Sequence, residues 1–267
     1  MKYKMVVADA DGTLLNDKKQ ITAATKNSIK KFRNMGGIFT LATGRGILSA
    51  TPYINELNID VPVILFNGCV IYDPVDKKIL HEKYLSDDLY KLTANIWQEG
   101  RYDVDILVYS IDGIFVNKIS DFIKSYMATE HVKCDIVDDL SSLNKIIKVL
   151  FRGNSKTSLQ LVDEIRQLSN EPFTCVQSDE FFIEILPYRV TKGTALVKLC
   201  DILNIDINMV VAIGDQDNDR EMILKAGCGV AMGNADNSIK NSANYIAKSN
   251  LEDGVSDILE KIINGEI

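Results

Sequence analysis

The sequence has few of the residues that build zinc sites or disulfide frameworks. Its 267 residues include five scattered cysteines with no C-x-x-C pair, and only two histidines, His81 and His131. Neither a zinc site nor a disulfide framework is therefore expected. An odd number of cysteines in a chain of this length suits a reducing compartment, where we expect them to pack as buried apolar side chains.

Long apolar runs and an excess of basic residues are also lacking. No stretch approaches the length that spans a bilayer, and residues 5–8 form too short an apolar run for a secretion signal. The net charge of −7 argues against a dedicated nucleic-acid binder, which usually carries a basic face. We therefore expect a cytoplasmic protein that binds neither nucleic acid nor membrane, with a monomer as the default assembly.

The first part of the chain alternates between short apolar runs and amphipathic stretches. Thr22 is a suitable helix N-cap, and Gly36 and Gly37 a suitable helix end. The pattern predicts strands at residues 4–8, 38–42 and 63–66, with helices at residues 22–35 and 47–57 between them. This order of strand and helix is typical of a parallel sheet.

The alternation of predicted strands and helices stops near residue 83 and resumes after Pro187. Between these points, the runs around Asp112-Gly113 predict a β-hairpin. The rest of this stretch predicts helices at residues 86–98 and 155–168 and strands at residues 145–152, 173–177 and 181–186, which we interpret as an antiparallel sheet with helices. Beyond it we expect helices at residues 193–203, 218–226 and 254–263 and strands at residues 209–213 and 229–232.

Two stretches of α/β character therefore bracket an insert of different character. We predict an α/β fold whose Rossmann-like, three-layer parallel-sheet core is discontinuous, formed by residues 1–82 and 188–267. Residues 83–187 are predicted to form an inserted α+β domain.

Polar side chains follow several of the predicted core strands at the point where each strand ends. Asp9 and Asp11 follow the first strand, and Thr43 and Asn67 follow two more. Three acidic residues, Asp215, Asp217 and Asp219, follow residues 209–213. Because ligands of open parallel sheets bind outside the carboxyl ends of the strands, these side chains are expected to share one crevice.

Several carboxylates in one crevice repel each other unless their pKa values rise or a cation lies among them. Oxygen ligands favour Mg²⁺, and a magnesium ion among acidic residues implies a phosphate substrate. Gly12 allows a sharp turn with N–H groups directed at an anion, and Lys192 adds positive charge at a predicted helix start.

Four segments resemble, in order, the four motifs of the haloacid-dehalogenase (HAD) superfamily. They are DADGTLL at residues 9–15, ATGR at 42–45, TKG at 191–193 and GDQDND at 214–219. Asn67-Gly68 and FIEILP at 182–187 narrow the resemblance to the Cof-type phosphatase branch. The resemblance spans essentially the whole chain, including the position and size of the insert, which it identifies as a cap domain.

The resemblance implies a Mg²⁺-dependent phosphatase that hydrolyses small phosphorylated metabolites, such as sugar phosphates or cofactor phosphates, through an aspartyl-phosphate. Asp9 would be the nucleophile, and Asp11 the acid and base. Thr43 would hydrogen-bond the phosphoryl group, and Lys192 would balance its charge. The implied metal ligands are Asp9, Asp11 through its backbone carbonyl, Asp215 and, directly or as support, Asp219. The implied substrate-binding residues are Gly44, Arg45, Asn67 and Asn218.

Other interpretations remain open from the sequence. Asp217 and Asp219 are also suitable helix caps, and Arg45 is equally suited to a structural ion pair. A sugar phosphomutase, or another phosphotransferase with the same nucleophile, would share all four motifs, whereas a receiver-type regulatory protein would lack D-x-D-G-T. In the cap, conceivable substrate contacts are Arg101, Lys118, Arg152, Lys156, Gln177 and Glu184, and no spacing selects among them.

Two positions depart from the pattern of the family. Ala10 fills a slot where a larger apolar residue is common, and Arg189 lies where a glycine often precedes the lysine motif. The first departure is expected to affect packing, and the second the conformation of the linker before Lys192.

Overall fold

The structure, a computed structural model, describes residues 2–179 and 181–267. The chain folds into two compact units. The core unit comprises the residues up to Arg45, Ala50–Glu82 and Thr191–Ile267, and the cap unit comprises Gly46–Ser49 and Lys83–Val190. Within the described residues, no helix is both long and apolar enough to cross a membrane.

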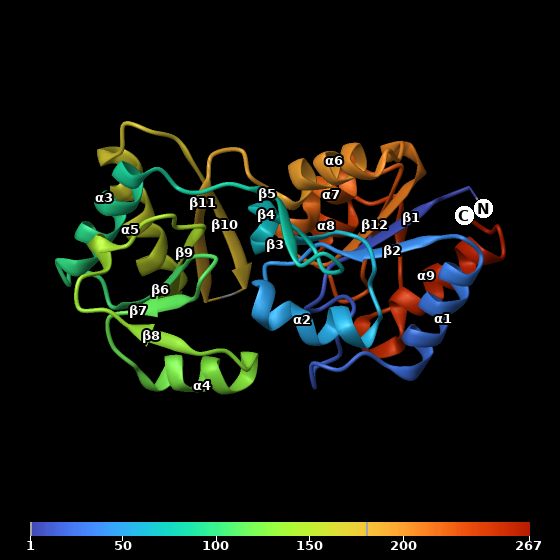
Figure 1. The fold of residues 1–267 in the computed structure, drawn as a ribbon, viewed down its shortest axis with the longest axis horizontal. Helices are drawn as coiled ribbons and strands as arrows, with labels where there is room; N and C mark the ends of the chain where they lie inside the picture. Colours follow the sequence, from blue (N-terminus) through green and yellow to red (C-terminus); the bar gives the residue numbers. More distant parts are fainter. Residues whose placement is uncertain (1, 180) are drawn as a thin grey trace. The chain divides into compact units, whose positions relative to one another are not determined.

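A parallel five-stranded sheet lies at the centre of the core unit (Figure 1). Its order is β14-β13-β12-β1-β2, with β1 at Met5–Ala8, β2 at Ile38–Leu41, β12 at Val210–Gly214, β13 at Cys228–Ala231 and β14 at Tyr245–Ile246. The chain leaves β1 toward β2 on one side and later returns to β12 on the other. Strand order therefore reverses at β1, and this is where a parallel sheet opens a crevice for ligands.

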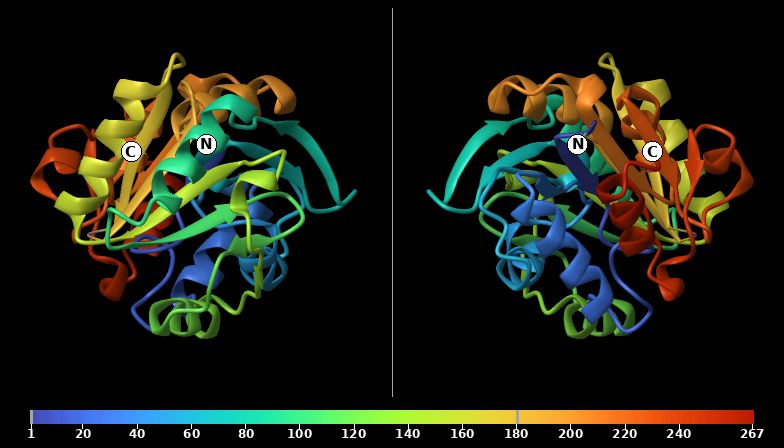
Figure 2. Two further views of the ribbon diagram at one scale, coloured as in Figure 1. Left: turned by 90° about the vertical axis from the view of Figure 1, so that its left-hand side faces the viewer. Right: turned by 90° about the vertical axis from the view of Figure 1, so that its right-hand side faces the viewer.

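Helices cover both faces of this sheet, which confirms the predicted three-layer α/β core. The helices are α1 (Ala23–Asn34), α2 (Ile47–Glu56), α6 (Lys192–Leu203), α7 (Arg220–Lys225), α8 (Asn237–Lys240) and α9 (Gly254–Ile263). Helices α6 and α7 lie on one face, and α1 and α9 lie side by side on the other (Figure 1 and the right-hand view of Figure 2). Met5 and Val7 of β1 pack with Leu196 and Leu199 of α6 in one apolar cluster.

Local sequence explains where α1 begins and ends. The Thr22 side chain accepts a hydrogen bond from the backbone N–H of Thr25, as expected of an N-cap. After the helix, Gly36 adopts a φ of +86°, a left-handed conformation that glycine reaches without a steric penalty.

The third predicted strand differs from its expected place in the parallel sheet. Residues Val63–Leu65 (β3) pair antiparallel with β4 (Val70–Asp73), which pairs with β5 (Lys78–Glu82). A single bridge, Ala42 to Ile64, connects β3 with the end of β2. The chain after β3 turns back on itself at once to pair with β4, while the Ile64 carbonyl accepts the backbone N–H of Thr43 after β2 at 2.9 Å.

The cap unit holds a six-stranded sheet in the order β10-β11-β9-β6-β7-β8. Its strands are β6 (Val104–Tyr109), β7 (Ile114–Val116), β8 (Cys134–Ile136), β9 (Lys148–Gly153), β10 (Phe173–Asp179) and β11 (Phe182–Pro187). Its helices are α3 (Asp87–Gln98), α4 (Asp121–Glu130) and α5 (Ser155–Leu168). Because β7 pairs with β8 in parallel, the sheet is mixed and not purely antiparallel as expected. Helix α4 and strand β8 were not predicted.

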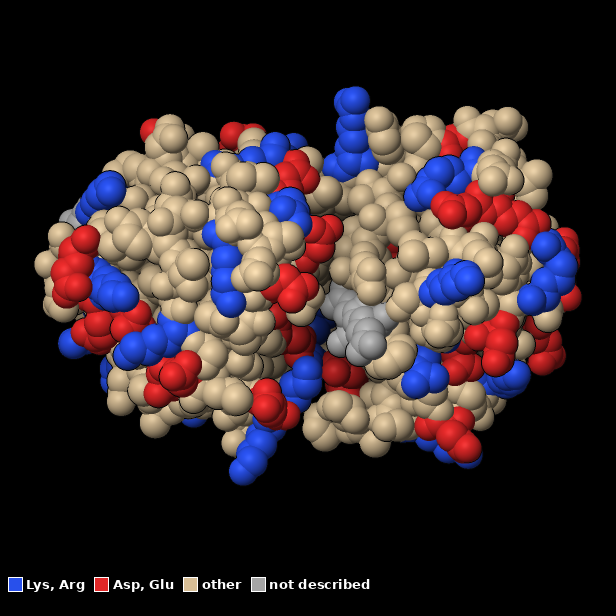
Figure 3. Space-filling model, turned by 180° about the vertical axis from the view of Figure 1, so that it is seen from behind, with Lys and Arg blue, Asp and Glu red and all other residues tan. Residues whose placement is uncertain are grey.

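The cap sheet has an apolar face and a more polar face. Ile106, Phe151 and Ile183, from three adjacent strands, belong to an apolar cluster that also contains residues of α3 and α5. Lys148 of β9 and Glu184 of β11, whose positions alternate with these, form a buried ion pair of 2.8 Å. On the face of the molecule drawn in Figure 3, acidic and basic side chains are interspersed.

Candidate active site

The ends of the central core strands bring together the acidic residues of the first and fourth motifs. Asp9 directly follows β1, and Asp215 directly follows β12. The two strands are neighbours, and the backbone N–H of Asp9 donates to the carbonyl of Ile213 at 3.0 Å. Asp9 and Asp215 are 5% and 3% exposed, so both carboxylates are withdrawn from bulk water.

Three carboxylates converge at this point. One oxygen from each of Asp9, Asp215 and Asp219 lies within 4.8 Å of the others. Burial and, after it, the charge of Asp219 raise the pKa of Asp215 to about 7. Burial also raises the pKa of Asp9 well above its usual range, despite the opposing effect of Lys192. Excess negative charge at one buried point suits the binding of a divalent cation.

Lys192 provides the cation that faces this acidic group. It is the first residue of α6, and its Nζ lies 2.8 Å from an oxygen of Asp9 and 2.6 Å from one of Asp219. Burial acts to lower the pKa of Lys192, but the charges of Asp219 and Asp9 outweigh it, so the pKa is raised. Thr191 and Thr194 form a capping box that fixes the start of the helix.

Asp219 uses both of its carboxylate oxygens within the protein. Oδ1 accepts from Lys192, and Oδ2 accepts the backbone N–H groups of Asp215 at 2.9 Å and Gln216 at 3.1 Å. These contacts hold Lys192 and the loop after β12 in place. One oxygen of Asp219 also belongs to the group of three carboxylates that could hold a metal ion.

The turn after β1 approaches Asp215 closely. The Thr13 hydroxyl donates to Asp215 Oδ1 at 2.7 Å. Gly12 has a φ of +74°, and a Cβ at this position would lie 2.2 Å from Asp215 Oδ2. Asn234, a residue that the sequence did not point to, donates its side-chain amide to the Gly12 carbonyl at 2.8 Å.

Asp11 belongs to a separate set of contacts. Arg45 donates Nε to Oδ2 at 2.7 Å and an Nη to Oδ1 at 2.8 Å, and Lys19 Nζ lies 2.5 Å from Oδ1. Burial acts to raise the pKa of Asp11, but the hydrogen bonds and charges of Arg45 and Lys19 lower it overall. Lys19 was not among the residues that the motifs predicted.

The second motif and the two predicted asparagines meet in a further set of contacts. Thr43 is buried, and its hydroxyl accepts the backbone N–H of Arg45 at 3.2 Å. Asn67 has a φ of +56°, and its Oδ1 accepts a hydrogen bond from Asn218 at 3.0 Å. Gly44 leaves the space that Asn67 needs, because a Cβ there would lie 3.1 Å from Asn67 Oδ1. The Asn218 Oδ1 is buried and has no hydrogen-bond partner among the described residues.

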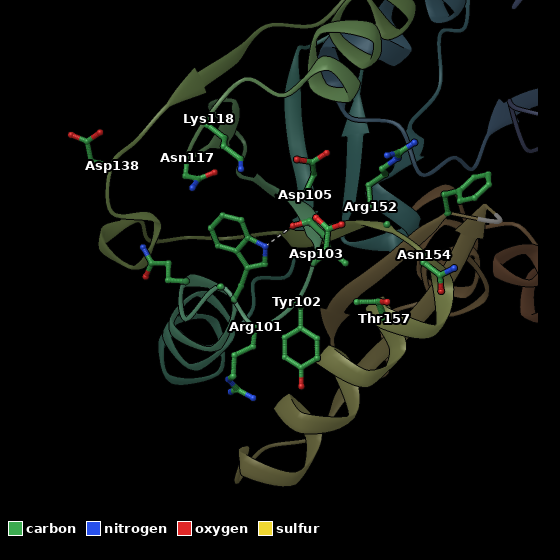
Figure 4. Close-up of a pocket in the computed structure, with 16 residues that line it drawn as sticks. Arg101, Tyr102, Asp103, Asp105, Asn117, Lys118, Asp138, Arg152, Asn154 and Thr157 are labelled. Carbon is green, nitrogen blue, oxygen red and sulfur yellow. Dashed lines mark hydrogen bonds between the residues drawn. The ribbon is translucent and has the colours of Figure 1, made fainter.

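The cap unit contains a polar cavity of about 930 Å³ (Figure 4). Three of the conceivable substrate contacts, Arg101, Lys118 and Arg152, line it. Arg101 already pairs with Glu164 at 2.6 Å, and the guanidinium of Arg152 lies 4.4 Å from the ring centroid of Phe122. The charged lining is mixed in sign and does not point to one class of ligand.

Comparison with known proteins identifies the family. The sequence model of the haloacid dehalogenase-like hydrolases matches residues 6–259. The chain belongs to this family. The protein YxeH of Bacillus subtilis is 30% identical over 270 residues, with 98% of both chains covered. A 5-amino-6-(5-phospho-D-ribitylamino)uracil phosphatase of B. subtilis, YwtE, is 29% identical over 288 residues, with 98% of this chain and 99% of the relative covered.

Solved structures agree with this assignment. A haloacid dehalogenase-like hydrolase from Bacteroides thetaiotaomicron superposes with a TM-score of 0.88 at 28% identity, covering 97% of this chain and 99% of that one. The HAD subclass IIB sugar phosphatase BT4131 shares the fold with a TM-score of 0.85 at 20% identity, covering 97% and 98%. The core with its inserted mixed-sheet cap is the arrangement of this subclass. By homology the protein is a phosphatase, that is, a phosphoric monoester hydrolase.

Proposed function

We propose that the protein hydrolyses a small phosphorylated metabolite through an aspartyl-phosphate formed on Asp9. The observation that carries this proposal is the buried pair of Asp9 and Asp215 at the carboxyl ends of β1 and β12, with Lys192 of α6 beside Asp9. Asp9 is held beside the ammonium group of Lys192 and a second carboxylate, Asp215. This arrangement suits a carboxylate nucleophile, because the phosphoryl group that it attacks carries negative charge of its own.

We infer Mg²⁺ as the cofactor, held by Asp9, Asp215 and the backbone carbonyl of Asp11. The donor set consists of hard oxygens, the kind that Mg²⁺ prefers. The raised pKa values of Asp9 and Asp215 support a cation at this point, since burial and, after it, the charge of neighbouring carboxylates destabilise the ionised forms. When bound, the ion would neutralise charge on the phosphoryl oxygens.

The residues of the chain divide the two half-reactions between them. A carboxylate oxygen of Asp9 attacks phosphorus while the bond from phosphorus to the leaving oxygen breaks, and Asp11 supplies the proton to that oxygen. Asp11 then takes a proton from water as the water oxygen attacks phosphorus, which releases inorganic phosphate and restores Asp9. Thr43, Gly44 and Asn218 bind the phosphoryl group, Asn67 orients Asn218, and Lys192 balances charge.

The substrate class that we propose is a phosphate monoester of a sugar or of a sugar-alcohol chain. The name of the relative YwtE describes a phosphorylated ribityl chain, whose leaving group is a primary alcohol. An alcohol is a poor leaving group and needs a proton, and this requirement suits a second carboxyl group, Asp11, two residues after Asp9.

The test is phosphate release from a panel of sugar and sugar-alcohol phosphates, with Mg²⁺ and with a chelator. The Asp9→Asn variant should lose at least a thousandfold in kcat, whereas the exposed Asp17→Asn variant should match the wild type. A folded wild-type protein that releases phosphate from no member would overturn the proposal, as would an active Asp9→Asn variant. Isomerisation of a hexose 1-phosphate without phosphate release would favour the phosphomutase alternative.

A further inference from the structure

We propose that Arg45 and Lys19 form a cationic clamp that sets the orientation of the Asp11 carboxylate for proton transfer with the leaving group. The inference rests on the proposed function, because it assigns positioning residues to the acid of that reaction. Neither residue would touch the reacting atoms, and both would act through Asp11.

The two cations hold Asp11 from different sides. The Arg45 side chain is 6% exposed and forms two parallel hydrogen bonds, which fix the plane of the carboxylate. The Lys19 and Asp11 side chains are 39% and 37% exposed, so Lys19 covers the open edge. A carboxylate with three charge-assisted donors keeps one orientation, whereas a lone Asp at a turn would sample several.

The backbone of Lys19 is itself held in an unusual conformation. Its φ is +56°, and its N–H donates to the carbonyl of Asn16 at 2.8 Å. Asn16 also accepts the backbone N–H groups of Lys18 and Gln20 on its side chain, at 3.0 and 3.1 Å. Left-handed conformations of residues other than glycine persist where surrounding contacts impose them, and they gather at functional sites.

Tyr53 of α2 connects the two halves of the clamp. Its hydroxyl donates to the backbone carbonyl of Lys19 at 3.3 Å. Its ring centroid lies 5.2 Å from the guanidinium carbon of Arg45. One aromatic side chain therefore contacts both cations that hold Asp11, so their positions are set together.

An exposed ion pair alone would not justify this assignment, because such pairs contribute little to stability. The clamp differs because a buried guanidinium, a constrained turn and a shared tyrosine all converge on one carboxylate. Arg45 and Lys19 also lower the pKa of Asp11, so the effect that we assign to them is on the orientation of its carboxyl group. Proton transfer depends steeply on this orientation.

The experiment compares two leaving groups in the same enzyme. p-Nitrophenolate departs without a proton, whereas the alkoxide of an alkyl phosphate requires one. Lys19→Met should lower kcat/KM on the order of tenfold for the best alkyl phosphate of the panel, and less than twofold for p-nitrophenyl phosphate. Lys19→Arg should restore much of the loss because it keeps the charge.

Lys18→Met is the matched control, since it removes the same charge from an exposed neighbour on the same turn. Lys19→Asn provides a second test, because asparagine adopts the left-handed backbone readily but is too short to reach Asp11. Equal losses for both leaving groups, or no loss for either, would overturn the clamp while Lys18→Met and the wild type still hydrolyse both substrates. Failure of the wild type on both substrates would instead contradict the proposed function.

Discussion

Lys192 and Asp9 form a buried ion pair in which Nζ lies 2.8 Å from Oδ1. The same ammonium lies 2.6 Å from Asp219, and Asp215 completes the acidic group. One cation therefore faces three carboxylates, which leaves the group net negative. This imbalance determines how the site should respond to substitution and pH.

Replacement of Lys192 should damage both stability and activity. Lys192→Met would leave two buried carboxylates without their cation, and the loss of one partner of a buried pair costs about 3–5 kcal/mol. We expect a fall of this size in the free energy of unfolding and a loss of at least a hundredfold in kcat. Denaturant unfolding and steady-state kinetics measure both. Lys198→Met, on an exposed position of the same helix, should change neither, and a fully active Lys192→Met would refute the role of the ammonium.

In the metal-free protein, the stability that Asp215 contributes should fall as pH rises from about 4 to about 7. The pKa of Asp215 rises from 3.8 in the unfolded chain to about 7 on burial, so the folded state binds more protons in this range. Stability conferred by the protonated form is complete below the lower value and lost above the higher one. A divalent cation should therefore raise Tm more at pH 8 than at pH 5.

The Asp215→Asn variant isolates this effect because an amide does not titrate in that range. Thermal unfolding of the variant should lack the part of the pH dependence that Asp215 contributes, and Mg²⁺ should stabilise it less. Wild-type and variant curves that stay parallel from pH 4 to pH 8 would show that another group controls the pH dependence.

Gly12→Ala should cost more than its backbone conformation alone explains. Gly12 and Gly36 both have positive φ, of +74° and +86°, so an alanine at either site is strained by roughly 1–2 kcal/mol. A Cβ at Gly36 meets nothing within 4 Å, whereas at Gly12 it would displace the Asp215 carboxylate. We expect Gly36→Ala to lose only stability, and Gly12→Ala to lose Mg²⁺ affinity as well, as calorimetric titration would show. Equal Mg²⁺ affinities in the two variants would count against Asp215 as a ligand.

The sequence predicted the central fold because its strands are buried runs that end in polar motifs. Strand β1 is buried at all four positions, and a signal of this kind survives without tertiary information. Among the elements that the sequence analysis did not predict, α4 and β5 bury few side chains, whereas β4 buries Val70 and Ile71. Helix α4 has only Ile123 fully buried, and β5 has no fully buried residue, so neither carries a strong apolar period.

The residues of the candidate site likewise fall into those that the sequence predicted and those that it did not. Asp9, Thr43, Lys192 and Asp215 lie in motifs with fixed spacing, and the structure brings Asp9, Lys192 and Asp215 to one point. Lys19 could not be predicted, because its contact with Asp11 depends on a local turn and on Tyr53, which lies 34 residues away along the chain. Such contacts leave no periodic signal in a sequence.

The buried ion pair of Lys148 and Glu184 allows the stability of the cap to be tested separately. Both side chains are almost inaccessible, at 4% and 2% exposure, and Nζ lies 2.8 Å from Oε2. Lys148→Met should lower the free energy of unfolding of the cap by about 3–5 kcal/mol, because it leaves Glu184 charged and buried. The double variant Lys148→Met/Glu184→Met should be more stable than Lys148→Met alone, since it removes the uncompensated charge as well. Denaturant unfolding of the full chain, monitored by hydrogen exchange of cap amides, measures the free energy of unfolding of the wild type, the two single variants and the double variant. A double variant as unstable as the sum of the single variants would mean that the two charges do not interact.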